Sequence, residues 1–243
     1  STIRNIVRTH PSGLWDGIQQ MLNQQETLTE VSLGGQTING SAQFFYALIA
    51  MTCLYGCFIG FGSAITLQAN LTALAARRCV TPTHKLKLIL SEQIASFLLG
   101  YFDVIVLLIY LRYILKLDFQ GKIGPMLLIS FFGSLIGVSI GIFVGSLGKM
   151  KEGGKIGIIL GFSMVCSFLS GLMNNTMKDL IEKNMPVINR INPAALISDA
   201  FYCINVYDDP ARYYRNLLTL AVMSSALVFA SFLLIRRESY DSI

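Results

Sequence analysis

Residue types that commonly perform catalysis are sparse in this chain. His10 and His84 are the only two histidines among 243 residues. A general base must lie within hydrogen-bond reach of the group that it activates, and a nucleophile needs such a base beside it. No arrangement of nucleophile and base, and no pair of catalytic carboxylates, is recognisable in the sequence. The chain is therefore predicted not to be an enzyme.

Two Gly-Lys pairs resemble fragments of a nucleotide-binding loop. They lie at 148–149 and 154–155, and they are followed by Met150 and Ile156. A P-loop requires Ser or Thr directly after its Lys, and it joins a strand to a helix. The sequence therefore predicts that this chain does not bind ATP through a P-loop.

Two cysteines share one helix face but lack further metal ligands. Cys53 and Cys57 are four residues apart in an apolar run, without a nearby His or carboxylate pair. A zinc site needs about four such ligands, whereas a buried free thiol packs as a small hydrophobe. We expect packing here and no metal site.

Asp103 is the one acid deep in an apolar stretch, the run 94–111. A carboxylate inside a membrane is costly, so such residues often mark a substrate or ion path. Asp103 is therefore a candidate substrate-pathway residue. The alternatives are a hydrogen bond to a neighbouring helix, or a place in a water-filled cavity with no direct substrate role.

The composition indicates an integral membrane protein. Hydrophobic residues make up 53% of the chain and charged residues only 14%, which departs strongly from soluble domains. The formal net charge is +5, but the basic residues sit mostly at the ends of apolar runs, as in membrane proteins. We therefore expect contact with membrane lipid and no nucleic-acid partner.

Hydropathy predicts an all-α helical bundle with five spanning helices in this chain. The first run has no charged residue over 24 positions, and a helix of that length reaches roughly 36 Å, enough for a hydrocarbon core about 30 Å thick. The polar segment 1–42 precedes a transmembrane domain at 43–243. The predicted spans are 44–67, 94–116, 125–147, 156–173 and 216–235.

Basic residues in the short loops predict the orientation. Lys and Arg are dense at 68–92, at 148–155 and in the tail 236–243, which places these segments in the cytoplasm. The N-terminus of the sequence then lies outside and the C-terminus inside. Because the sequence starts with Ser, we expect a further helix before it and six spans in the full chain.

The segment 174–213 is predicted to contain an outer helix that does not cross the membrane. Asn192 and Pro193 form an N-cap and first-turn signal, and about fifteen helical residues reach only about 22 Å. Such a helix should dip into the outer interface or lie on it. Asp209 and Pro210 give a second start signal, which opens the last span.

Glycine recurs at every fourth residue in the third span. Such spacing lets the backbone of a neighbouring helix approach closely. The glycines either pack inside the bundle or form a face that slides against a partner during transport. They are Gly133, Gly137, Gly141 and Gly145, with shorter echoes at Gly56/Gly60 and Gly157/Gly161.

The basic loop between the first two spans has the features of a structured elbow. Leu67, Leu71 and Leu74 continue a helical stripe beyond the first span, and Thr81-Pro82 is typical of a new helix start. Together with its order of parts, the chain resembles a known family: the integral membrane subunits of type 2 ABC exporters, including bacterial permeases. The stretch ARRCVTPTHKLKLIL is similar to the first cytoplasmic loop of that family, and INPAALISDAFYCINVYDDPARYYRNLL is similar to its outer re-entrant segment and last helix.

The resemblance covers about residues 44–243 and implies a permease at the cell membrane. It implies a partner ABC ATPase subunit that binds ATP and Mg²⁺, a second permease subunit in a homodimer or heterodimer, and no cofactor on this chain. The loop 68–92 corresponds to the coupling helix, although Ala73 to Ala76 stand where many members have a Glu-rich run. The residues expected to contact the ATPase are Leu74, Arg77, Arg78, Thr81, Pro82, Thr83 and His84.

The implied function is ATP-driven export of a hydrophobic or amphipathic substrate. Two alternatives remain. One is an ion-coupled secondary transporter or channel that uses Asp103, and the other is a membrane scaffold that does not transport. Arg77 and Arg78 also fit a purely orienting role, in contact with lipid headgroups.

Overall fold

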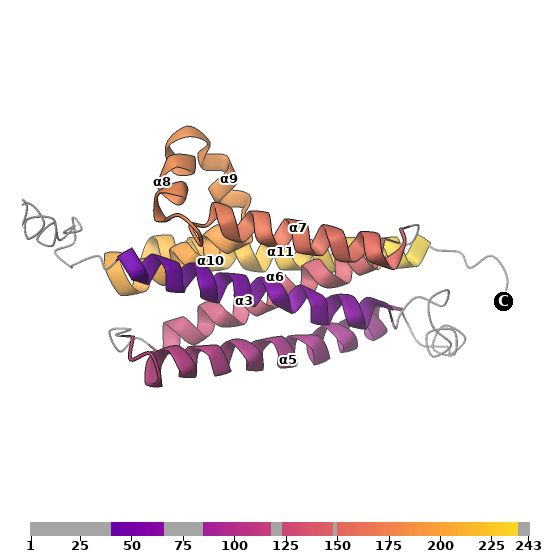
Figure 1. Ribbon diagram of the computed structural model, residues 1–243. Coiled ribbons are helices and arrows are strands. Elements are labelled where there is room, and N and C mark those ends of the chain that lie inside the picture. Colours follow the sequence, from indigo (N-terminus) through magenta and orange to yellow (C-terminus); the bar gives the residue numbers. More distant parts are fainter. Residues whose placement is uncertain (1–39, 66–84, 118–122, 148–149, 238–243) are drawn as a thin grey trace, which may run out of the picture. The chain divides into compact units, whose positions relative to one another are not determined.

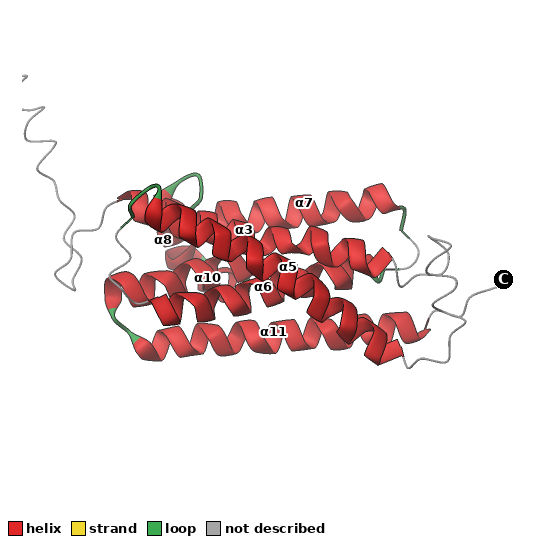
Figure 2. Cartoon of the chain, turned by 90° about the horizontal axis from the view of Figure 1, so that it is seen from below, coloured by secondary structure: helices red, strands yellow, loops and turns green. Residues whose placement is uncertain are grey.

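The computed structural model describes residues 40–65, 85–117, 123–147 and 150–237. Five of its helices are long and apolar enough to cross a membrane, which confirms the predicted all-α bundle of five spans. They are α3 (Gly40–Ile65), α5 (Lys85–Tyr113), α6 (Ile123–Gly145), α7 (Glu152–Leu169) and α11 (Pro210–Arg237). Figure 1 shows the five helices side by side, and Figure 2 shows that α5 crosses the others obliquely.

Helices α3 and α6 form the centre of the bundle. Cys53, Cys57 and Ala64 of α3 lie against Gly133, Gly141 and Gly145 of α6 in the same order, so the two helices run parallel. Helix α5 packs on both of them, and α11 packs on α6. The structure thus places the glycine face of the third span inside the bundle.

The contact between α3 and α6 is one of backbone on backbone. A Cβ atom added to Gly137 would overlap the Cys53 carbonyl oxygen, and one added to Gly141 would overlap that of Cys57. Gly60 of α3 meets the carbonyl of Val138 in the same way. The glycine pair of α7 does not make such a contact, because a Cβ atom added to Gly157 or Gly161 would have no atom within 4 Å.

Polar side chains join these helices inside the apolar bundle. Gln93 of α5 donates to the Ser139 hydroxyl of α6 at 3.0 Å, and the hydroxyls of Ser63 and Ser96 lie 2.6 Å apart. Cys53 and Cys57 are buried and pack against the glycines of α6. Hydrogen bonds between spanning helices are modestly stabilising, about 0.6 kcal/mol each.

The segment between α7 and α11 folds into short helices at one end of the bundle (Figure 1). They are α8 (Asn175–Asn184), α9 (Pro186–Ile191), α10 (Pro193–Tyr202) and the π-helical turn η1 (Cys203–Tyr207). Helix α7 ends just before Gly171, whose φ is 96°, a value that glycine adopts readily.

Both predicted start signals of this segment are confirmed. The Asn192 side chain accepts a hydrogen bond from the Ala194 amide at 2.9 Å, and Pro193 begins α10. The Asp209 carboxylate accepts from the Ala211 and Arg212 amides at the start of α11. Every residue of α10 is buried, so this helix is enclosed by protein and does not lie on the surface of the bundle.

Candidate functional site

The residues predicted to contact an ATPase lie outside the described part of the chain. Leu74, Arg77, Arg78 and the run Thr81–His84 all fall between residues 66 and 84. The structure resumes at Lys85, the first residue of α5. The coupling contact therefore stays a prediction.

Asp103 lies on the face of α5 that points away from the bundle. Its side chain is exposed, as are those of Phe102 and Val106. Within the described residues it makes no hydrogen bond or ion pair, and it does not line the cavity described below. The structure thus places this carboxylate on the outside of the bundle, about two-thirds of the way along α5.

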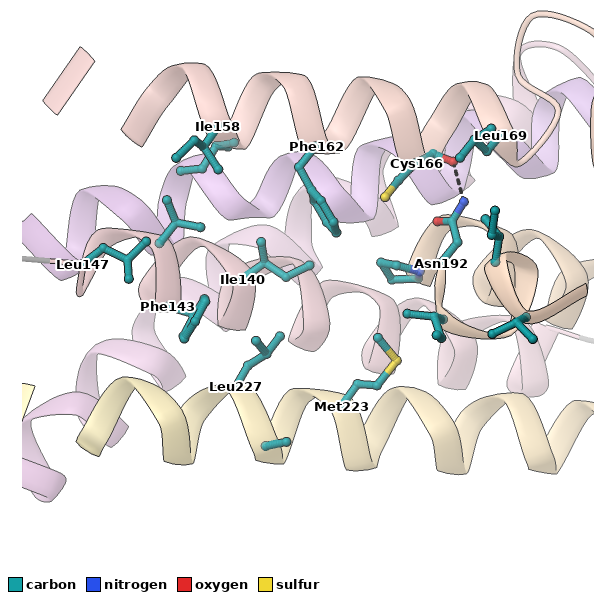
Figure 3. Close-up of a pocket in the computed structure, with 17 residues that line it drawn as sticks. Ile140, Phe143, Leu147, Ile158, Phe162, Cys166, Leu169, Asn192, Met223 and Leu227 are labelled. Carbon is teal, nitrogen blue, oxygen red and sulfur yellow. Dashed lines mark hydrogen bonds between the residues drawn. The ribbon is translucent and has the colours of Figure 1, made fainter. Parts of the chain in front are cut away.

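The cavity of interest lies between α7 and α11, with α6 behind it (Figure 3). Its volume is about 700 Å³, within the range of roughly 300–1,000 Å³ typical of ligand sites. It is lined by Ile140, Phe143 and Val144 of α6, with Leu147 just after that helix; Ile158, Ile159, Phe162, Cys166 and Leu169 of α7; Val187, Ile188 and Ile191 of α9; Asn192 and Pro193; and Met223, Ala226 and Leu227 of α11.

Helix periodicity explains why these side chains converge. Ile158, Phe162 and Leu169 recur at spacings of four and seven on α7, so they share one face, and Figure 3 shows Phe162 directed toward α11. Met223 and Leu227 are four apart on α11 and point back. The cavity is thus built mainly by apolar stripes on regular helices, and Leu147 and Asn192, which lie just outside helices, complete its lining.

Asn192 is the only lining residue with a polar side-chain amide or charge, and its amide is already paired. Its Nδ2 donates to the Cys166 carbonyl at 2.9 Å, while its Oδ1 accepts from Ala194. The cavity therefore offers a ligand apolar contact and shape, but no acid, base or charge from its lining residues.

A cluster of charged residues around a buried carboxylate lies at the end of the bundle that carries α8 to α10. The Asp199 carboxylate of α10 accepts from Lys178 Nζ at 3.1 Å, and from Arg212 Nε and Nη2, each at 2.8 Å. Asn216 Nδ2 donates to it at 2.8 Å. These contacts join α8, α10 and α11 through one side chain, and we call these four residues the Asp199 cluster.

The cluster controls the ionisation of its members. Burial raises the pKa of the Asp199 carboxyl, but Lys178, Arg212 and Asn216 outweigh burial, so the pKa lies below its ordinary value. Burial and the Asp199 charge raise the pKa of the nearby Cys203 thiol to about 12. Asp199 is therefore a carboxylate at neutral pH and Cys203 a thiol.

Sequence reasoning missed both the cavity and the Asp199 cluster. One signal was present, because Asp199 is an acid within a ten-residue stretch that is otherwise apolar or small. Arg212 and Asn216 also lie at i and i+4 on one helix. The cavity had no such signal, since its shape depends on how α6, α7, α9 and α11 pack.

One comparison with known proteins bears on this arrangement. The family model described as ABC-2 family transporter protein matches residues 3–233. No curated protein and no solved structure gives a significant match. The family match thus extends over nearly the whole chain, from before the first span into the last one, and it includes the segment that carries the Asp199 cluster.

Proposed function

Since the chain belongs to the ABC-2 transporter family, we propose that this multi-pass membrane permease is a subunit of an ATP-driven exporter. Family membership implies association with an ABC ATPase subunit. In the proposal, that ATPase binds ATP and Mg²⁺, and a second permease subunit completes the membrane part. The substrate is hydrophobic or amphipathic and leaves the cell or its inner leaflet.

The cavity between α7 and α11 is the observation that supports a hydrophobic or amphipathic substrate. Its volume of about 700 Å³ and its apolar lining suit a ligand that is held by the hydrophobic effect, at roughly 25 cal/mol per Å² of apolar surface buried. A polar solute would lose its hydration there without gaining partners.

Coupling to the ATPase is assigned to the loop 68–92. ATP-driven closure of the ATPases would push on this loop and rock the spans, which requires the loop to contact the open and closed ATPases differently. The contact residues proposed on the family resemblance are Leu74, Arg77, Arg78 and Thr81 to His84. The protein lies in the plasma membrane with the α8–α10 end outside and its C-terminus in the cytoplasm.

Reversing two charges in the loop tests this proposal. We expect Arg77→Glu with Arg78→Glu to leave membrane insertion unchanged, but to uncouple ATP hydrolysis from transport or to abolish co-purification of the ATPase. The matched control is Lys149→Glu with Lys151→Glu, which reverses two charges in the other basic loop at 148–155. Normal transport by the Arg77/Arg78 double variant would refute the site assignment.

The same reconstituted system separates the alternatives. Transport that needs no ATPase and is lost in Asp103→Asn would identify an ion-coupled transporter. An assembled complex whose ATP hydrolysis does not respond to any of a panel of hydrophobic amphiphiles would identify a scaffold. Substrate-stimulated hydrolysis that requires both subunits is the result expected for the exporter.

A further inference from the structure

The cavity is elongated along the helices. On α7 it extends from Ile158 to Leu169, and eleven residues of helix rise about 16 Å. This length is close to one half of a hydrocarbon core about 30 Å thick. The cavity is therefore a slot that runs beside α7 over about the depth of one membrane leaflet.

The slot opens on the outside of the described bundle. Phe162 in its α7 wall is 42% exposed, and Val187 and Ile191 of α9 are each 62% exposed. Such apolar side chains would face water in a soluble protein, but α7 is a candidate membrane span. A ligand can therefore reach the slot from the side, out of the surrounding membrane.

The slot is open along one side, so its occupant is whatever fills the space beside the helices. Phe162 and Ile191 are exposed in its wall, next to α7, a candidate membrane span. The apolar groups that fill such space in a bilayer are hydrocarbon chains.

The chemistry of the lining agrees with this shape. The only polar side-chain amide, that of Asn192, has its donor and acceptor paired within the protein. Headgroup atoms placed in the slot would lose water without replacement, at about 1–3 kcal/mol per unpaired group. The polar end of an amphiphile must therefore remain outside the slot.

We propose that the slot between α7 and α11 binds a single hydrocarbon chain of an amphiphile, which enters sideways from the bilayer and keeps its headgroup outside. This inference rests on the proposed function in one respect, because it identifies the substrate class as a chain-bearing amphiphile. Binding itself does not depend on ATP hydrolysis, so the two can be tested separately.

Photolabelling tests the site. The full chain with its ATPase partner is reconstituted in phosphatidylcholine vesicles that contain a long-chain alkyl amphiphile with a diazirine in mid-chain, and labelled peptides are mapped by mass spectrometry without nucleotide. We expect labelling to concentrate on 158–169 and 223–227, well above Leu218 and Phe229, which are exposed apolar residues of α11 outside the slot. Equal labelling of Leu218 and Phe229 would overturn the proposal, because it would report only general contact with lipid.

A filling variant makes the test specific. Ala226 lines the slot and Ala221 of the same helix does not. Ala226→Phe should lower labelling of the slot about tenfold by occupying its volume, whereas Ala221→Phe should leave it unchanged. If Ala226→Phe does not fold, Leu227→Phe narrows the slot from the same helix. Unchanged labelling in a folded filling variant would refute the site.

A second measurement decides whether the hydrocarbon chain in the slot comes from a transported substrate or from a structural lipid. If the labelled amphiphile also stimulates ATP hydrolysis, and Ala226→Phe removes that stimulation, the hydrocarbon chain in the slot belongs to a transported substrate. Specific labelling without any stimulation would show a structural lipid in the slot; it would refute the substrate assignment made here and leave the proposed export to its own test.

Discussion

Asp199 is the residue on which the polar contacts at the α8–α10 end converge. Its carboxylate accepts from Lys178, Arg212 and Asn216, and it is only 7% exposed. Removing one partner of a buried ion pair is strongly destabilising, because it leaves the other charge uncompensated. The side chain of Arg212 is 38% exposed, and solvent screening there reduces the effect.

We therefore expect Asp199→Asn to lower stability by roughly 2–3 kcal/mol. The measurement is the thermal midpoint of the detergent-purified protein, followed by fluorescence-detected size exclusion after heating. Glu152→Gln is the control, since Glu152 is exposed at the start of α7 and surface changes stay within about 0.5 kcal/mol. An equal midpoint for Asp199→Asn and the control would contradict a stabilising role of the cluster.

The lowered pKa of Asp199 also predicts a pH dependence. A carboxyl with a depressed pKa contributes its full stability above its unfolded value, near 3.9, and loses it as pH falls through the folded pKa. The advantage of the wild-type chain over Asp199→Asn should thus be constant from pH 7 to about 5 and shrink below about pH 4. Thermal midpoints of both proteins across this range measure it, and an advantage that persists unchanged at pH 3 would exclude the ionised Asp199 as its source.

At the scale of helices, the close packing at the glycines of α6 could be predicted from the sequence, but the helix that packs there could not. The spacing of Gly137 and Gly141 is a local property, so a close helix contact could be read from the sequence. The identity of the partner helix could not be read from the sequence, because the residues of α3 and α6 that meet are about 80 positions apart in the chain. Gly157 and Gly161 share that spacing, yet they have no neighbour in the described structure.

Paired alanine substitutions measure this difference. Gly141→Ala places a methyl group against the Cys57 carbonyl, and we expect a loss of about 1–3 kcal/mol from overpacking. Gly161→Ala meets open space and should be neutral or slightly stabilising, because alanine is the better helix former by about 1 kcal/mol. Thermal midpoints of the two variants provide the comparison, and equal loss in both would show that packing on α3 is not the cause.

Helix start signals and tertiary features differ in the same way. The caps at Asn192 and Asp209 act within three residues, and so the starts of α10 and α11 were predictable. The slot and the Asp199 cluster each combine three or more separate elements. Sequence periodicity identifies the apolar face of one helix, but it does not say which faces meet or where they leave a space.

At the scale of the whole molecule, the outer face of α5 has the properties of a subunit contact. Asp103 is exposed there, about two-thirds of the way along the helix and ten residues before its end, beside apolar Phe102 and Val106. A charge at mid-span costs about 2.5–3.5 kcal/mol unless it finds a partner, and Asp103 has none among the described residues. In the proposed exporter, a polar group of the second permease subunit meets this carboxylate.

We therefore expect Asp103→Leu to weaken association between permease subunits, while the thermal midpoint of the isolated chain stays equal or rises. Co-purification of two differently tagged subunits measures the association. Phe102→Leu is the matched control, because it keeps an apolar side chain at the adjacent position. Full association of Asp103→Leu subunits would place Asp103 away from the subunit contact.

The backbone contact between α3 and α6 also limits how this protein can evolve. Every amino acid except glycine has a Cβ atom, so each missense change at codon 137 or 141 meets the same carbonyl oxygens of Cys53 and Cys57. Compensation by the partner side chain is not available, since a carbonyl oxygen is present whatever residue occupies α3. These two codons should tolerate only synonymous change in a lineage that keeps the helix pair, whereas codons 157 and 161 are free of this contact.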